Sequence, residues 1–289
     1  MKHLSLFKQS TFTIELPSTT NKATVWFFGD VHRDLPNCDT DRWKDFLKQA
    51  REDDNAEHTY YFGMGDYHDF ASAKENKKLR DGQLHEQTVE AISELVQKRN
   101  RAFAMEIKQM RGRLIGLIGG NHTWILDNLI TSDEDLANRM GCEYLGWLSF
   151  VNLRIKAGTK QVSYPIVACH GLGGGRVLGS QVRKVEDLFQ VFPTASIYIM
   201  GHDHSRGAWP QSRLVPSYGK NGEIKIRQDR QLFCRSGSFM RAYLENESSY
   251  PVGKLMRPSD LGALRIDLSI DRSCKDKSDV INRDMKVIY

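Results

Sequence analysis

The chain has 289 residues, 40% of them hydrophobic, which is enough to bury a substantial core. Charged residues make up 27% and aromatic residues 10%, a composition that excludes intrinsic disorder for most of the chain. The excess of 41 Lys and Arg over 36 Asp and Glu helps a phosphate-bearing ligand approach but is no signature of nucleic-acid binding. No apolar run is long enough to span a membrane and the amino terminus lacks a signal-peptide pattern, so we expect a cytoplasmic protein without membrane partners.

Five short apolar runs are typical of buried strands, and each ends in a glycine-containing turn that carries Asp, Asn or His. Strands of an α/β sheet deliver such turns to one edge of the sheet, so we expect the five turns to lie close together. The runs are residues 24–28, 59–62, 114–118, 165–169 and 196–200.

Amphipathic stretches between these runs predict helices, and the pattern changes to short alternating strands in the β-rich portion 205–270. A charged tail, 271–289, follows. No long linker divides the chain, so we expect residues 1–289 to form one domain. The predicted helices are 41–52, a helix within 82–113, and 180–192; the predicted later strands are 223–227, 230–234 and 262–270.

The five turns supply seven side chains that bind metals through oxygen or imidazole nitrogen. Each alone is ordinary at a turn or in a core, but their joint occurrence indicates a metal site, and seven donors suit two ions. Two divalent ions that share a carboxylate and a hydroxide favour in-line displacement at phosphorus, which is hydrolysis of a phosphate ester. The seven are Asp30, His32, Asp66, Asn121, His170, His202 and His204.

These turns resemble the five blocks of the calcineurin-like metallophosphoesterases. The resemblance covers residues 24–204, and Gly237-Ser238 is similar to a Gly-Ser pair that often closes the core of that family. The matching blocks are Gly29-Asp30-Val31-His32, Gly65-Asp66, Gly120-Asn121-His122, His170-Gly171 and Gly201-His202-Asp203-His204.

The resemblance implies a four-layer αββα sandwich, in which two mixed β-sheets are flanked by helices. It also implies a division of the ligands between two metals. Asp30, His32 and His204 would hold the first metal, Asn121, His170 and His202 the second, and Asp66 would bridge them. His122 would be the general acid that protonates the leaving oxygen, a role that an imidazole with an ordinary pKa of about 6.5 performs near neutral pH.

The donor set leaves the metal open. Mn²⁺ is the first candidate, and Fe, Zn or Ni also suit mixed imidazole, carboxylate and amide ligands. Candidate substrate contacts are Arg33 and His68, which adjoin ligands as Asp69 does, and Arg176, which follows a glycine-rich turn and equally matches a solvated charge run. The substrate is expected to be a phosphate ester, and the oligomeric state is left open.

Two alternatives remain at this stage. A DNA or RNA nuclease would use the same site, with the basic stretch 97–101 and its neighbours Lys108, Arg111 and Arg113 as a backbone-binding surface. That stretch lacks interleaved aromatics and is more typical of a solvated helix face. A non-catalytic scaffold would keep the fold, but packing alone does not require so many polar groups at strand ends.

Overall fold

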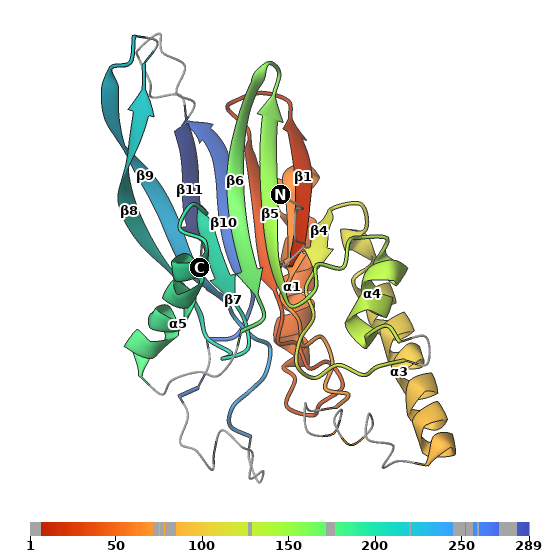
Figure 1. Ribbon diagram of the computed structural model, residues 1–289. Helices are drawn as coiled ribbons and strands as arrows, with labels where there is room; N and C mark the ends of the chain where they lie inside the picture. The colour runs from red at the N-terminus through yellow and green to blue at the C-terminus, as the bar shows by residue number, and fades with distance from the viewer. Residues whose placement is uncertain are drawn as a thin grey trace.

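Two mixed β-sheets pack face to face and carry helices on their outer sides (Figure 1). The computed structural model describes residues 7–71, 75, 78, 85–126, 129–171, 177–219, 221–244, 252, 257–258, 260–271 and 282–288. The first sheet has the order β1 (Lys8–Leu16), β5 (Leu148–Ala157), β6 (Lys160–Cys169), β7 (Ile197–Met200), β9 (Ile224–Ser236), β8 (Arg206–Tyr218). The second has the order β11 (Asn282–Ile288), β10 (Leu264–Asp271), β2 (Lys22–Phe28), β3 (Thr59–Gly63), β4 (Leu114–Leu117).

Parallel pairing joins the strands that the predicted metal-binding turns follow. In the second sheet β2, β3 and β4 are parallel, and in the first sheet β6, β7 and β9 are parallel. The remaining pairs are antiparallel except β1 with β5. Parallel neighbours end on the same side, so each sheet presents its carboxyl strand ends at one edge.

The core lies between the two sheets and is built from alternate residues of their strands. Phe27 of β2 stacks on Phe62 of β3 within this layer, with ring centroids 5.5 Å apart. On the outer side of the second sheet lie α1 (Thr40–Glu52), α3 (Glu86–Glu106) and α4 (Ser132–Met140). On the outer side of the first sheet lies α5 (Leu178–Val191). The predicted αββα sandwich is therefore confirmed.

Local sequence explains where these helices begin and end. Asp39 accepts a hydrogen bond from the backbone N–H of Arg42 and caps α1, and Thr131 caps α4 in the same way through Glu134. Gly141 closes α4 with a φ of 67°, a left-handed conformation that glycine adopts without strain. Short 3₁₀ helices, Ala56–His58 and Lys108–Met110, precede β3 and β4. Within the described part of the chain, no helix is long and apolar enough to cross a membrane.

The structure departs from the sequence prediction mainly outside the five glycine-ended strands. The strands β1 and β5 and the helix α4 were not predicted, and the charged tail contains β11, which pairs with β10. The break predicted between 227 and 230 is wrong, because β9 continues through it. Asp229 is buried there and pairs with Arg213 and Arg283, so a charged residue sits inside a continuous strand.

Candidate metal centre

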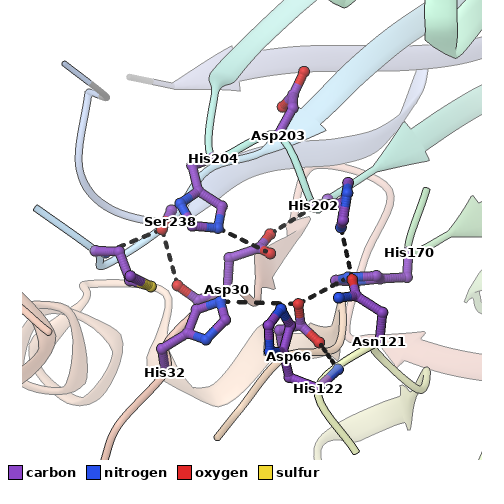
Figure 2. Close-up of polar contacts among 12 residues, drawn as sticks. Asp30, His32, Asp66, Asn121, His122, His170, His202, Asp203, His204 and Ser238 are labelled. Atoms are coloured by element: carbon purple, nitrogen blue, oxygen red, sulfur yellow. Dashed lines mark hydrogen bonds and ion pairs between the residues drawn. The ribbon is translucent and has the colours of Figure 1, made fainter. Parts of the chain in front are cut away.

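The turns that follow the carboxyl ends of β2, β3, β4, β6 and β7 meet at one place. Each strand is followed directly by the turn that the sequence marked, and the turns direct their side chains toward one another (Figure 2). All seven predicted ligands and His122 are therefore brought together by the fold. Asp30, Asp66 and His170 are almost completely buried, whereas His122 and His204 are partly exposed and lie on the solvent side.

One cluster of donors consists of Asp30, His32 and His204, whose ligand atoms all lie within 4.8 Å of one another. Nε2 of His204 is 3.7 Å from Oδ1 of Asp30. That oxygen and both ring nitrogens of His32 are buried without a hydrogen-bond partner. A buried polar atom without a partner is costly, so these atoms fit a bound cation better than an empty core.

A second cluster consists of Asp66, His170 and His202, again with ligand atoms within 4.8 Å of one another. Oδ1 of Asn121 joins it, at 2.9 Å from Nε2 of His170 and 2.7 Å from Nδ1 of His202. The other nitrogen of His170 lies 2.8 Å from the carbonyl oxygen of Met64, which fixes the ring so that Nε2 faces the cluster.

Asp66 belongs to the second cluster and also faces the first (Figure 2). Its Oδ2 atom is 3.1 Å from Nε2 of His170 in one cluster and 3.8 Å from Nε2 of His32 in the other. Its Oδ1 atom accepts a hydrogen bond of 3.0 Å from the backbone N–H of His122. This position is the one that a bridging carboxylate requires.

His122 lies beside the two clusters and, with His32 and Asp69, forms a third group of donor atoms within 4.8 Å of one another. Its Nδ1 is 2.5 Å from Oδ1 of Asp69, and Oδ2 of Asp69 is 3.9 Å from Nδ1 of His32. Sequence reasoning did not assign Asp69 this role. The only signal was its place three residues after Asp66, which put it in the same turn.

Burial sets the charge of the first cluster. It raises the pKa of Asp30 to about 8, and it lowers the pKa of His32. Burial also lowers the pKa of His204 to about 3 and, in the second cluster, burial and the neighbouring His170 lower the pKa of His202 to about 4. Three imidazoles are thus neutral at pH 7, the state in which a ring nitrogen offers its lone pair to a metal.

Opposite charges dominate around Asp66. Burial opposes ionisation of both partners, but the charge and hydrogen bond of Asp66 raise the pKa of His170 to about 9, and the same contacts lower the pKa of Asp66. Burial lowers the pKa of His122, but the hydrogen bond to Asp69 and the negative charges of Asp66 and Asp69 together outweigh it, and the net pKa is raised.

The backbone of the centre is held in an unusual conformation. Six non-glycine residues of the described chain have a positive φ, and five of them are predicted metal ligands. Left-handed backbone is uncommon outside glycine and costs about 1–3 kcal/mol per residue, so it clusters at functional sites. The five are Asp30 (46°), His32 (44°), Asp66 (49°), His202 (69°) and His204 (57°).

Neighbouring groups hold these turns in place. The hydroxyl of Ser238 donates a 2.9 Å hydrogen bond to the carbonyl oxygen of Asp30, which gives the predicted Gly237-Ser238 pair its place beside the site. The N–H of Gly120 donates a 2.8 Å hydrogen bond to Oδ2 of Asp133, a residue in the first turn of α4 whose pKa burial raises to about 7. Sequence analysis did not identify Asp133, because α4 itself was not predicted.

The predicted substrate contacts occupy different positions. Arg33 forms a 2.9 Å ion pair with Glu106 of α3. His68 is buried, stacks on Phe70 and lies 3.6 Å from Asp34, so its position does not favour contact with a substrate. Arg176 lies outside the described residues. Neither Arg33 nor His68 is brought into the donor clusters.

Comparison with known proteins adds little to this description. No protein-family model matches the chain, and no curated protein matches its sequence. Among solved structures, Vps29 from Chaetomium thermophilum, crystallised with the RaPID-derived cyclic peptide RT-D3, is similar with a TM-score of 0.29 and 10% sequence identity. The match covers 92% of this chain and 96% of that chain. Such a distant likeness transfers no property to this chain.

Proposed function

We propose that the protein is a metal-dependent phosphoesterase that hydrolyses a phosphomonoester or a phosphodiester. The observation that carries the proposal is the pair of donor clusters that meet at Asp66, with His122 beside them. Oxygen and imidazole donors without thiolate suit divalent ions such as Mn²⁺, with Fe, Zn or Ni as alternatives.

Each side chain has a separate task in this proposal. Two divalent ions bound at the clusters would activate the attacking water and neutralise charge on the phosphate oxygens. Asp66 would hold both ions, which explains why its carboxylate faces both clusters. Asp30, His32 and His204 would hold one ion; Asn121, His170 and His202 would hold the other.

His122 would supply the proton that the leaving oxygen needs. An alkoxide is a poor leaving group, so its departure is faster when a neighbouring acid protonates it. Asp69 accepts the hydrogen bond from Nδ1 of His122 and stabilises the protonated ring, which leaves the proton on Nε2 free for transfer. Both residues are about one quarter exposed, so a substrate can reach them.

The test is a comparison of the wild-type protein, loaded with Mn²⁺, with the His122→Asn variant on alkyl and aryl phosphoesters. We expect the variant to keep two Mn²⁺ per chain and to lose roughly 10²–10⁴ in turnover of alkyl esters, with a smaller loss on activated aryl esters. His58→Asn is the matched control, because His58 lies in the 3₁₀ helix before β3, outside the centre.

Two results would count against the proposal. A wild-type chain that binds no divalent metal would rule out the proposed centre. A chain that binds two Mn²⁺ but hydrolyses no phosphomonoester, phosphodiester, nucleotide or nucleic acid would favour a scaffold that retains the fold.

A further inference from the structure

Arg235 of β9 is a fully buried cation that contacts the turn carrying His202 and His204. Its Nη1 donates to the carbonyl oxygen of Gly201 at 2.9 Å, and its Nη2 lies 3.2 Å from Oδ2 of Asp203. Its Nε and Nη2 both donate to the carbonyl oxygen of Gln181 in α5, at 3.1 and 3.0 Å. The side chains of Arg235 and Asp203 are only 2% and 3% exposed.

Asp203 separates the two ligands His202 and His204, and it points away from the other labelled side chains of the centre (Figure 2). Its second oxygen, Oδ1, accepts hydrogen bonds from the N–H and hydroxyl of Ser205 at 3.1 and 2.5 Å. The turn that carries His202 and His204 is therefore held by Arg235 at Gly201 and at Asp203. At its end, the hydrogen bonds from Ser205 to Asp203 close it.

This fixation matters because His202 and His204 both have left-handed backbone, with φ of 69° and 57°. A turn with two such residues relaxes unless surrounding contacts hold it. The planar guanidinium makes contacts in several fixed directions at once, which a lysine ammonium on a flexible stem does not reproduce.

We propose that Arg235 is a positioning residue that holds His202 and His204 in their metal-binding orientation by tying their turn to α5. This inference rests on the proposed function, since it assigns the two histidines to the two metals. Arg235 itself is not among the proposed metal ligands.

The charge of Arg235 and its contacts predict opposite effects of its removal on metal binding. A buried positive charge beside two dications repels them, so its loss would strengthen metal binding if charge were its only contribution. Loss of a positioning contact weakens metal binding instead, typically 10–100-fold for residues that orient ligands. The direction of the change therefore separates the two roles.

The experiment measures Mn²⁺ affinity and stoichiometry by calorimetry and by the EPR signal of bound Mn²⁺, using the full chain. We expect Arg235→Gln to weaken Mn²⁺ binding by roughly 10–100-fold, and Arg235→Lys, which keeps the charge, to weaken it similarly. Arg213→Gln is the matched control, because Arg213 lies on β8 of the same hairpin and pairs with the buried Asp229. Thermal unfolding of the metal-free proteins shows whether each variant is folded. If Arg235→Gln does not fold, the result for Arg235→Lys decides.

The outcomes separate the two claims. A wild-type chain that does not bind two Mn²⁺ overturns the proposed function. If the wild type binds two, then unchanged or tighter binding by Arg235→Gln overturns the positioning role, as does wild-type affinity in Arg235→Lys. Equal weakening in Arg213→Gln would show a general loss of hairpin stability and would also overturn it.

Discussion

Asp69 and His122 are 53 positions apart in sequence, yet Oδ1 of the first is 2.5 Å from Nδ1 of the second. We expect Asp69→Asn to lower turnover of alkyl phosphoesters by roughly 10–100-fold, because the asparagine no longer stabilises the protonated ring. Steady-state kinetics on alkyl and aryl esters checks this, with the exposed Asp54→Asn as control. Equal losses on both ester classes would remove the link to leaving-group protonation.

Asp66→Asn should reduce bound metal as well as activity. The substitution keeps the shape of the side chain but removes the negative charge that faces both donor clusters, so two dications would repel each other without compensation. Elemental analysis of the purified variant measures the metal content, with exposed Asp45→Asn of α1 as control. Retention of two metals with full turnover would show that Asp66 is not a bridge.

Gly120→Ala should displace the Asp66 carboxylate from its place in the centre. A Cβ atom there would overlap the Asp66 carboxylate, with only 2.8 Å to its Cγ atom. We expect weaker Mn²⁺ binding and a loss of about 1–3 kcal/mol in the free energy of unfolding, the usual cost of overpacking. Gly179→Ala in α5 is the control, because a Cβ there meets no atom within 4 Å and alanine favours a helix. A normal metal content in Gly120→Ala would show that the turn relaxes freely.

The basic surface of α3 tests the nuclease alternative. Lys98, Arg99 and Arg101 are exposed, while Val96, Asn100 and Phe103 of the same helix are buried, as a solvated helix face requires. We expect reversal of the three basic residues to Glu to leave hydrolysis of a small phosphodiester unchanged. If the reversal abolished cleavage of DNA or RNA while it spared the small diester, the protein would be a nuclease.

The carboxylate of Asp267 in β10 should make stability depend on pH. It accepts hydrogen bonds from Lys22 at 2.5 Å, Thr24 at 2.9 Å and Arg265 at 3.0 Å. Burial raises the pKa of Asp267, but these bonds outweigh it, so the folded pKa lies below the ordinary value. A depressed pKa stabilises the fold above the unfolded-state pKa of about 3.9, and the contribution disappears as pH falls through the folded value.

Asp267→Asn should therefore lower the free energy of unfolding by about 1–3 kcal/mol at pH 7, and by less in acid. Urea unfolding at pH 7 and pH 3 measures the difference between wild type and variant. A difference that grew toward acid would contradict the assigned direction of the pKa.

The sequence predicted which side chains meet at the centre because all seven lie in turns that follow five recognisable strands. Asp30 after β2 and His170 after β6 are marked by local pattern alone, and the fold then places the strand ends together. Partners such as Asp69 for His122, Asp133 for Gly120 and Arg235 for Asp203 come from distant segments. Their pairing depends on how the sheets and helices pack, which no local pattern encodes.

The same limit applies to the fold. The strand β5 lies between β1 and β6, and α4 begins at a capping threonine after an irregular stretch. Gly158 follows β5, but its turn carries no Asp, Asn or His, and α4 is not a strand, so neither element matched the pattern that marked the five strands. The family resemblance predicted two sheets flanked by helices, but the division of strands between them depends on long-range pairing, which the sequence pattern did not predict.

The left-handed backbone at five of the seven predicted ligands has a consequence for how this sequence drifts under mutation. Glycine at any of these positions would relieve local strain, so selection for stability alone favours replacing the Asp or His found there. A lineage that no longer used the centre would lose these residues early and fold more stably without them.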